Sequence, residues 1–104
     1  MSTPGGQDLI RLMALHAIRD SLPGTGRKTQ QLRLLAALER LGSVTTFEGS
    51  RHLDLYDVRA RKMELVRAGH PVLMAWEVIQ TESGELHRVG RYFLARDAAP
   101  EVRA

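Results

Sequence analysis

Apolar positions follow two different periods along this chain, one helical and one extended. Between Gln7 and Ala68 they recur every three or four residues, in segments interrupted by Gly, Pro and Asp, which is the period of amphipathic helices. After Pro71 they recur at every second residue, which is the period of a strand. The pattern therefore predicts a mostly α fold that ends in a small antiparallel β hairpin.

The first predicted helix, Gln7–Ser21, has a broad apolar side. One helical stripe carries Ile10, Met13, Ala14, Ala17 and Ile18, and Leu9 and Leu12 lie beside it. A helix with so much apolar surface must pack on the rest of the chain or pair with a second chain. Both interpretations stay open, and the second predicts a homodimer that forms through Leu9, Ile10, Met13 and Ala17.

A second helix is predicted over Thr29–Leu41, after a Gly- and Pro-containing connector at Leu22–Lys28. Thr29 is expected to cap its first turn and Gly42 to end it. Its apolar face consists of Leu32, Leu35, Ala36, Leu38 and Leu41. This face is expected to form part of a leucine-rich core.

Two short helices joined by a turn are predicted within Ser43–Gly69, after a three-residue extended segment. Thr45 and Glu48 have the spacing of a capping box, which starts the first of these helices and carries it to about Leu53. Phe47 and Leu53 are its expected core residues. This order indicates a helix-turn-helix.

The second helix of this unit runs from Val58 to Ala68 in the prediction, with Asp57 as its cap and Gly69 as its end. Val58 and Leu65 are expected to point inward. The flanks and outer side carry Arg59, Arg61, Met63 and Arg67. Its rotation stays open at the middle, where either Met63 turns inward or Lys62 packs its aliphatic stem and keeps its charge in water.

The strand pattern after Pro71 predicts a hairpin, with strands at Val72–Ile79 and Leu86–Ala95 and a loop at Thr81–Glu85. Val44 of the short extended segment is expected to point inward and to add a third strand. Trp76 is interpreted as a core residue. The predicted organisation is therefore a tail, helix and connector at 1–28, a domain at 29–95 and a polar tail at 96–104.

Three blocks of this sequence carry a resemblance to a known family: GSVTTFEGSRHLDL, RARKMELVRAGHPV and HRVGRYFL. Over about Gln30 to Leu94 the chain resembles short winged helix-turn-helix proteins of bacteriophages and prophages. The resemblance implies a winged helix-turn-helix with an extra N-terminal helix, and DNA binding as its presumed activity.

Basic side chains occur where such a protein needs them, on the second helix of the unit and on the hairpin. The candidate DNA contacts are Arg51, His52, Arg59, Arg61, Lys62, Arg67, His87, Arg88 and Arg91. Arg59 and Arg61 are expected to reach base edges, where an arginine pairs with guanine through two hydrogen bonds. Arg67 suits a phosphate, and the hairpin residues suit phosphates or the minor groove. The competing interpretation of all these charges is a solvated surface.

Composition and charge alter this picture little. A formal net charge of +3 is a weak argument for an anionic partner. The absence of cysteine excludes disulfides and thiolate metal sites. With no signal peptide or membrane-spanning segment in its pattern, the chain is expected in the cytoplasm.

Enzymatic motifs are missing from the sequence. The four histidines lack metal-ligand spacing, and the Gly24–Thr29 segment departs from a phosphate-binding loop because Arg27 precedes Lys28 and a helix precedes the segment. No catalytic residue, metal, cofactor or small-molecule ligand is expected.

The sequence thus predicts a protein that binds double-stranded DNA sequence-specifically, as a homodimer and as a phage or prophage transcriptional regulator. The alternative is a winged-helix module for protein contact in phage assembly, recombination or host-factor binding. That alternative would use the apolar first helix, with Trp76 and Tyr92 as exposed anchors.

Overall fold

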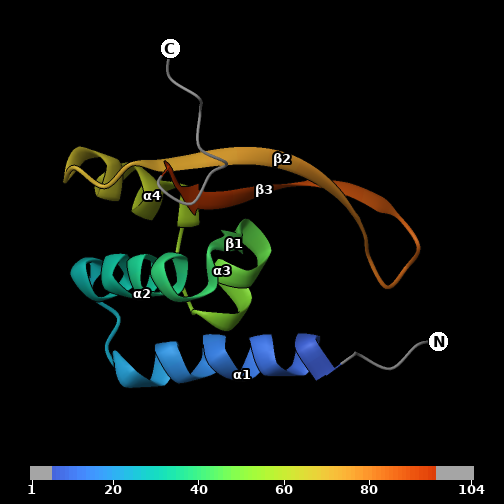
Figure 1. Cartoon of the computed structure of the whole chain (residues 1–104), viewed down its shortest axis with the longest axis horizontal. Helices are drawn as coiled ribbons and strands as arrows, with labels where there is room; N and C mark the ends of the chain where they lie inside the picture. The colour runs from blue at the N-terminus through green and yellow to red at the C-terminus, as the bar shows by residue number, and fades with distance from the viewer. Residues whose placement is uncertain (1–5, 96–104) are drawn as a thin grey trace, which may run out of the picture.

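Four helices and three strands make up the computed structural model, which describes residues 6–95, with side chains from Asp8 onward. The tails expected at residues 1–6 and 96–104 fall almost entirely outside this range. The elements are α1 (Gly6–Ser21), α2 (Arg27–Leu41), β1 (Ser43–Thr45), α3 (Thr46–His52), α4 (Val58–Arg67), β2 (Val72–Gln80) and β3 (Leu86–Leu94). Figure 1 shows α1 on one side of α2 and α3, and the hairpin on the other side.

The three strands form one antiparallel sheet in the order β1–β3–β2. Val44 of β1 is paired with Tyr92 of β3, and Trp76 of β2 is paired with Gly90 of β3. The predicted hairpin and the third strand are therefore confirmed. Helices α1, α2 and α4, the three strands and the segment after α3 supply the buried core. It comprises Leu15, Ile18, Leu34, Ala37, Leu38, Val44, Leu53, Leu55, Val58, Leu65, Val72, Tyr92 and Leu94.

Helix α1 packs on this core along one narrow edge. Leu15 and Ile18 are buried, whereas Ile10 and Met13 keep 67% and 63% of their surface exposed. Leu9 and Ala17 are exposed as well. The helix is thus a core helix, and most of its predicted apolar stripe still faces solvent.

Helix α2 begins two residues earlier than expected and is rotated. Its N-cap is Gly26, so the predicted cap at Thr29 is wrong. Leu34, Ala37 and Leu38 are buried, whereas Leu32, which was expected on the apolar face, is exposed. The inward side also carries polar residues that are buried and hydrogen-bonded, Gln30 and Arg33.

Arg33 is the main such residue, because it is buried and forms no ion pair with a carboxylate of residues 8–95. Its guanidinium donates hydrogen bonds to the backbone carbonyls of Leu22 and Gly24 in the α1–α2 connector, and to those of Leu53 and Asp54 in the turn before α4. A buried charge must be compensated by partners of this kind. Arg33 therefore joins two loops that are far apart in the sequence.

Local capping chemistry sets the ends of α3 and α4 as predicted. The capping box between Thr45 and Glu48 is complete, and the Asp57 side chain accepts a hydrogen bond from the backbone N–H of Ala60. Gly69, directly after the C-cap of α4, has φ of +101°, a left-handed conformation that favours glycine. The expectation that Phe47 anchors the core is wrong, because its side chain is 47% exposed.

Candidate nucleic-acid interface

The burial of its side chains defines the outward face of α4. Val58 and Leu65 are buried, and Lys62 is half-buried. Met63 is exposed, so the stem of Lys62 packs and Met63 does not turn inward. The exposed face carries Arg59, Met63, Val66 and Arg67, one or two turns apart.

Arg61 is held inside the protein despite its position near the start of α4. Its side chain is 11% exposed. It donates two hydrogen bonds to Glu64, at 2.7 and 3.0 Å, and further ones to the Gln30 side chain and the Tyr56 carbonyl. The hydrogen bond from Arg61 lowers the pKa of the Glu64 carboxyl. Contact between Arg61 and a base edge would require this ion pair to open.

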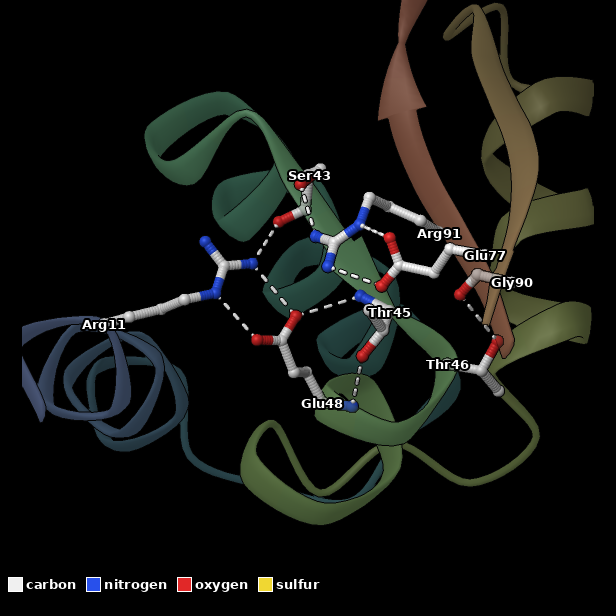
Figure 2. A network of polar contacts seen from close by, with 8 residues as sticks. All are labelled: Arg11, Ser43, Thr45, Thr46, Glu48, Glu77, Gly90 and Arg91. Carbon is white, nitrogen blue, oxygen red and sulfur yellow. Dashed lines mark hydrogen bonds and ion pairs between the residues drawn. The ribbon is translucent and has the colours of Figure 1, made fainter. Parts of the chain in front are cut away.

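Arg91 is also paired within the protein. Its guanidinium donates to both carboxylate oxygens of Glu77, at 2.9 and 2.8 Å, and to the Ser43 hydroxyl at 2.8 Å. This hydrogen bonding with Glu77 raises the pKa of Arg91 and lowers that of Glu77. The pair links β3 to β2, and Figure 2 shows it beside Ser43 of β1.

Next to that pair, Glu48 links α1 to the helix-turn-helix (Figure 2). Arg11 donates to both of its carboxylate oxygens, at 2.7 and 2.9 Å, and the backbone N–H of Thr45 donates to one of them at 3.0 Å. Burial alone would raise the pKa of Glu48, but these hydrogen bonds outweigh it and the pKa is lowered. The network joins α1, α3, β1, β2 and β3 and serves as scaffold.

His52 is directed toward α1. One of its ring nitrogens lies 3.0 Å from a ring nitrogen of His16, close enough for a hydrogen bond between the two imidazoles. Burial, followed by the nearby His16 and Arg51, lowers the pKa of His52. This favours an uncharged imidazole, which has little attraction for a phosphate at neutral pH.

The remaining candidates have side chains whose polar groups are available to a partner. Within residues 8–95, six of the nine make no side-chain hydrogen bond or ion pair: Arg51, Arg59, Lys62, Arg67, His87 and Arg88. Two of them stack on aromatic rings instead. The Arg51 guanidinium lies 5.2 Å from the centroid of the Phe47 ring, and that of Arg88 lies 4.5 Å from the Trp76 ring.

Trp76 is 60% exposed, so its interpretation as a core residue is wrong. The reason is the length of the hairpin. Along the inward face of β2 the exposed fraction rises from 4% at Val72 through 38% at Met74 to 62% at Val78, because this part of the strand extends past the helices. Tyr92 was expected as a second exposed anchor, but it is buried on the part of the same face that the helices do cover.

A groove separates the hairpin from α3. One part, of about 670 Å³, lies between Phe47 and Arg51 of α3 and the end of the hairpin. A second part, of about 440 Å³, is lined by Arg59 of α4 and by Trp76 and Arg88 of the hairpin. The basic residues of α3, α4 and the hairpin therefore meet along one concavity.

The aromatic lining of this groove was missed in the sequence. The available signal was the nine-residue length of β2, which exceeds what the short helices α3 and α4 can cover. Among the described residues, no three His, Asp or Glu side chains are grouped so as to hold a metal ion, and none of their helices is long and apolar enough to cross a membrane.

Comparison with known protein families gives a match. Residues 29–97 match the model of a family described as the winged helix-turn-helix domain. The matched segment begins within α2 and includes the helix-turn-helix and the hairpin, while α1 lies before it. No curated protein and no solved structure matches the chain.

Proposed function

The chain belongs to the winged helix-turn-helix domain family, and we propose that it binds double-stranded DNA with α4 as the recognition helix and the β2–β3 hairpin as the wing. The observation that carries the proposal is the outward face of α4. It presents Arg59 near its N-terminus and Arg67 near its C-terminus, and neither side chain makes a hydrogen bond or ion pair within residues 8–95.

In this proposal Arg59 meets base edges in the major groove, because the N-terminal part of a recognition helix lies deepest there. Met63 and Val66 lie on the same exposed face and suit the methyl groups of thymine. Arg67 suits a phosphate that fixes the register of the helix on the duplex. Arg61 and Arg91 stabilise the interface without contacting DNA, because their guanidiniums form ion pairs with Glu64 and Glu77.

Sequence-specific regulation of transcription is the finer part of the proposal. The direct support for sequence specificity is the mixed basic and apolar face of α4, which offers partners to both base edges and thymine methyls. The phage or prophage association rests on the sequence resemblance alone.

A module for protein contact is the second candidate. It is favoured by the exposed apolar surface of α1 at Leu9, Ile10 and Met13. We also propose that this surface pairs two copies of the chain, which is compatible with DNA binding because many helix-turn-helix proteins bind two half-sites as dimers.

The proposed function is tested by measuring the affinity for a pool of random duplexes at several salt concentrations. Binding is expected to weaken steeply as salt rises, because phosphate contacts release counterions. Arg67→Ala is expected to reduce the slope of log affinity against log salt by about 1, and Arg59→Ala to cost about 1–3 kcal/mol on a selected site.

Arg40→Ala is the matched control, since Arg40 is an exposed arginine on α2 at a surface away from α3, α4 and the hairpin. It should leave the affinity nearly unchanged. A chain that fails to retain any duplex at low salt does not have the proposed function.

A further inference from the structure

The groove between α3 and the hairpin contains exposed aromatic side chains. Trp76 lies on the inward face of the hairpin beyond the helices, and Phe47 of α3 lines the same part of the groove. Gly90, which is paired with Trp76 across the strands, has no side chain to cover the indole. The groove is therefore open at its aromatic residues.

The two parts of the groove are continuous, because Phe47, Arg88 and Val89 line both. Their volumes of about 670 and 440 Å³ fall within the range of about 300–1,000 Å³ in which proteins bind small organic groups. The groove is thus large enough for successive nucleotides of one strand.

The groove is also cationic. Arg51, Arg59 and Arg88 line it, and among its lining residues they face a single carboxylate, that of Glu82. Arg51 and Arg88 lie over the two aromatic rings, so each ring has a guanidinium against it. Positive charge alternating with exposed aromatic rings suits a partner that carries phosphates together with flat, apolar groups.

Unpaired nucleotides have this chemistry. In duplex DNA the faces of the bases are stacked on each other, and a protein reaches only base edges, sugars and phosphates. In a single strand the faces are available, and they stack on aromatic side chains and guanidinium planes.

We propose that the groove between α3 and the hairpin binds a single-stranded segment of DNA, with bases stacked on Trp76 and Phe47 and phosphates held by Arg51 and Arg88. This inference rests on the proposed function and extends it. Because Arg59 of α4 lines the same groove, an unpaired segment there continues directly from a duplex on the recognition helix.

The experiment uses Trp76 as its own reporter, since it is the single tryptophan of the chain. The full chain is titrated at low salt with an oligothymidylate of about 12 nucleotides, a length within the range of known single-strand sites. Stacking of a base on the indole is expected to quench its fluorescence. A duplex of equal length is expected to bind with less quenching.

Variants are compared through the anisotropy of labelled oligonucleotides, with circular dichroism to confirm folding. Trp76→Ala is expected to weaken single-strand binding about fivefold or more, the equivalent of losing one stacked base. Trp76→Phe should retain most of the affinity because it keeps a ring. Leu73→Ala is the matched control, since Leu73 is an exposed residue of the same strand on the opposite face.

The outcomes separate this inference from the proposed function. Duplex binding without oligothymidylate binding overturns the inference and leaves the proposed function standing. An equal loss of both activities in Trp76→Ala, or single-strand binding that is insensitive to Trp76→Ala, also overturns it. A chain that self-associates, with Trp76→Ala abolishing that association and not DNA binding, identifies the groove as a protein contact instead.

Discussion

Gly49 of α3 lies against Leu55 and against Val58 at the start of α4. A Cβ atom built there would lie 3.1 and 3.2 Å from the two methyl groups of Val58 and 3.3 Å from a methyl group of Leu55. All three distances are tight, and both neighbours are buried. The absence of a side chain at Gly49 thus permits the crossing of the two helices.

Gly49→Ala is therefore expected to destabilise the fold by about 1–2 kcal/mol, since overpacking costs about 1–3 kcal/mol and the gain in helix propensity returns only about 0.5–1 kcal/mol. Urea unfolding measures the change. A double-mutant cycle with Val58→Ala provides the control, because removing the valine methyls makes room for the new Cβ. If Gly49→Ala is equally destabilising with and without Val58→Ala, the clash is not its cause.

Residues whose role depends on near neighbours in the sequence were predictable. Thr45, Glu48, Asp57 and Gly69 act within four residues of their own position, so their spacing alone indicated their roles. Roles that depend on distant segments were not predictable. The pairing of Arg91 with Ser43 and the link from His52 to His16 join residues more than 35 positions apart.

At the scale of elements, α1 carries the clearest prediction, because its apolar surface at Leu9, Ile10, Met13 and Ala17 remains exposed in the monomer. We expect light scattering at tens of micromolar to give the mass of a dimer. Ile10→Asp and Met13→Asp are each expected to give a monomer that still folds, since neither side chain contributes to the core.

The matched control for α1 is Leu32→Asp, which places the same charge at an exposed leucine of α2. It should leave the mass unchanged. A monomeric mass for the unaltered chain rules out this dimer. A dimer that survives both α1 substitutions places the contact elsewhere.

Most elements were predicted to within two residues because capping groups and glycines mark their ends. Which side of α2 packs on the core was predicted less well. Its leucines occur on more than one side of the helix, so the apolar pattern fits several rotations, and the observed one is the rotation that buries Arg33 and Gln30 among hydrogen-bond partners. The helices and strands that carry the candidate site, and its basic residues, were predictable. The groove between them was not.

At the scale of the whole molecule, three carboxylates predict how stability depends on pH. The pKa values of Glu48, Glu64 and Glu77 are all lowered from the ordinary value of 4.5 by hydrogen bonds from arginines, in the case of Glu48 against the opposing effect of burial. The folded state thus releases these protons more readily than the unfolded state does. Their contribution to stability is complete above about pH 4.5 and is lost as the pH falls below it.

Urea unfolding at a series of pH values between about 7 and 3 tests this expectation. The midpoint is expected to fall in the acidic part of the series, and Glu48→Gln is expected to reduce that dependence because one of the three groups no longer titrates. A midpoint that stays constant across the series would contradict the proposed role of these ion pairs.

Arg33 has a consequence for the autonomy of the winged domain. A fragment that begins at residue 29, where the family match begins, would retain the carbonyls of Leu53 and Asp54 but lose those of Leu22 and Gly24. It would also uncover the surface on which Leu15 and Ile18 pack. We therefore expect a fragment that begins at residue 29 to be less stable than the chain that includes α1 and its connector.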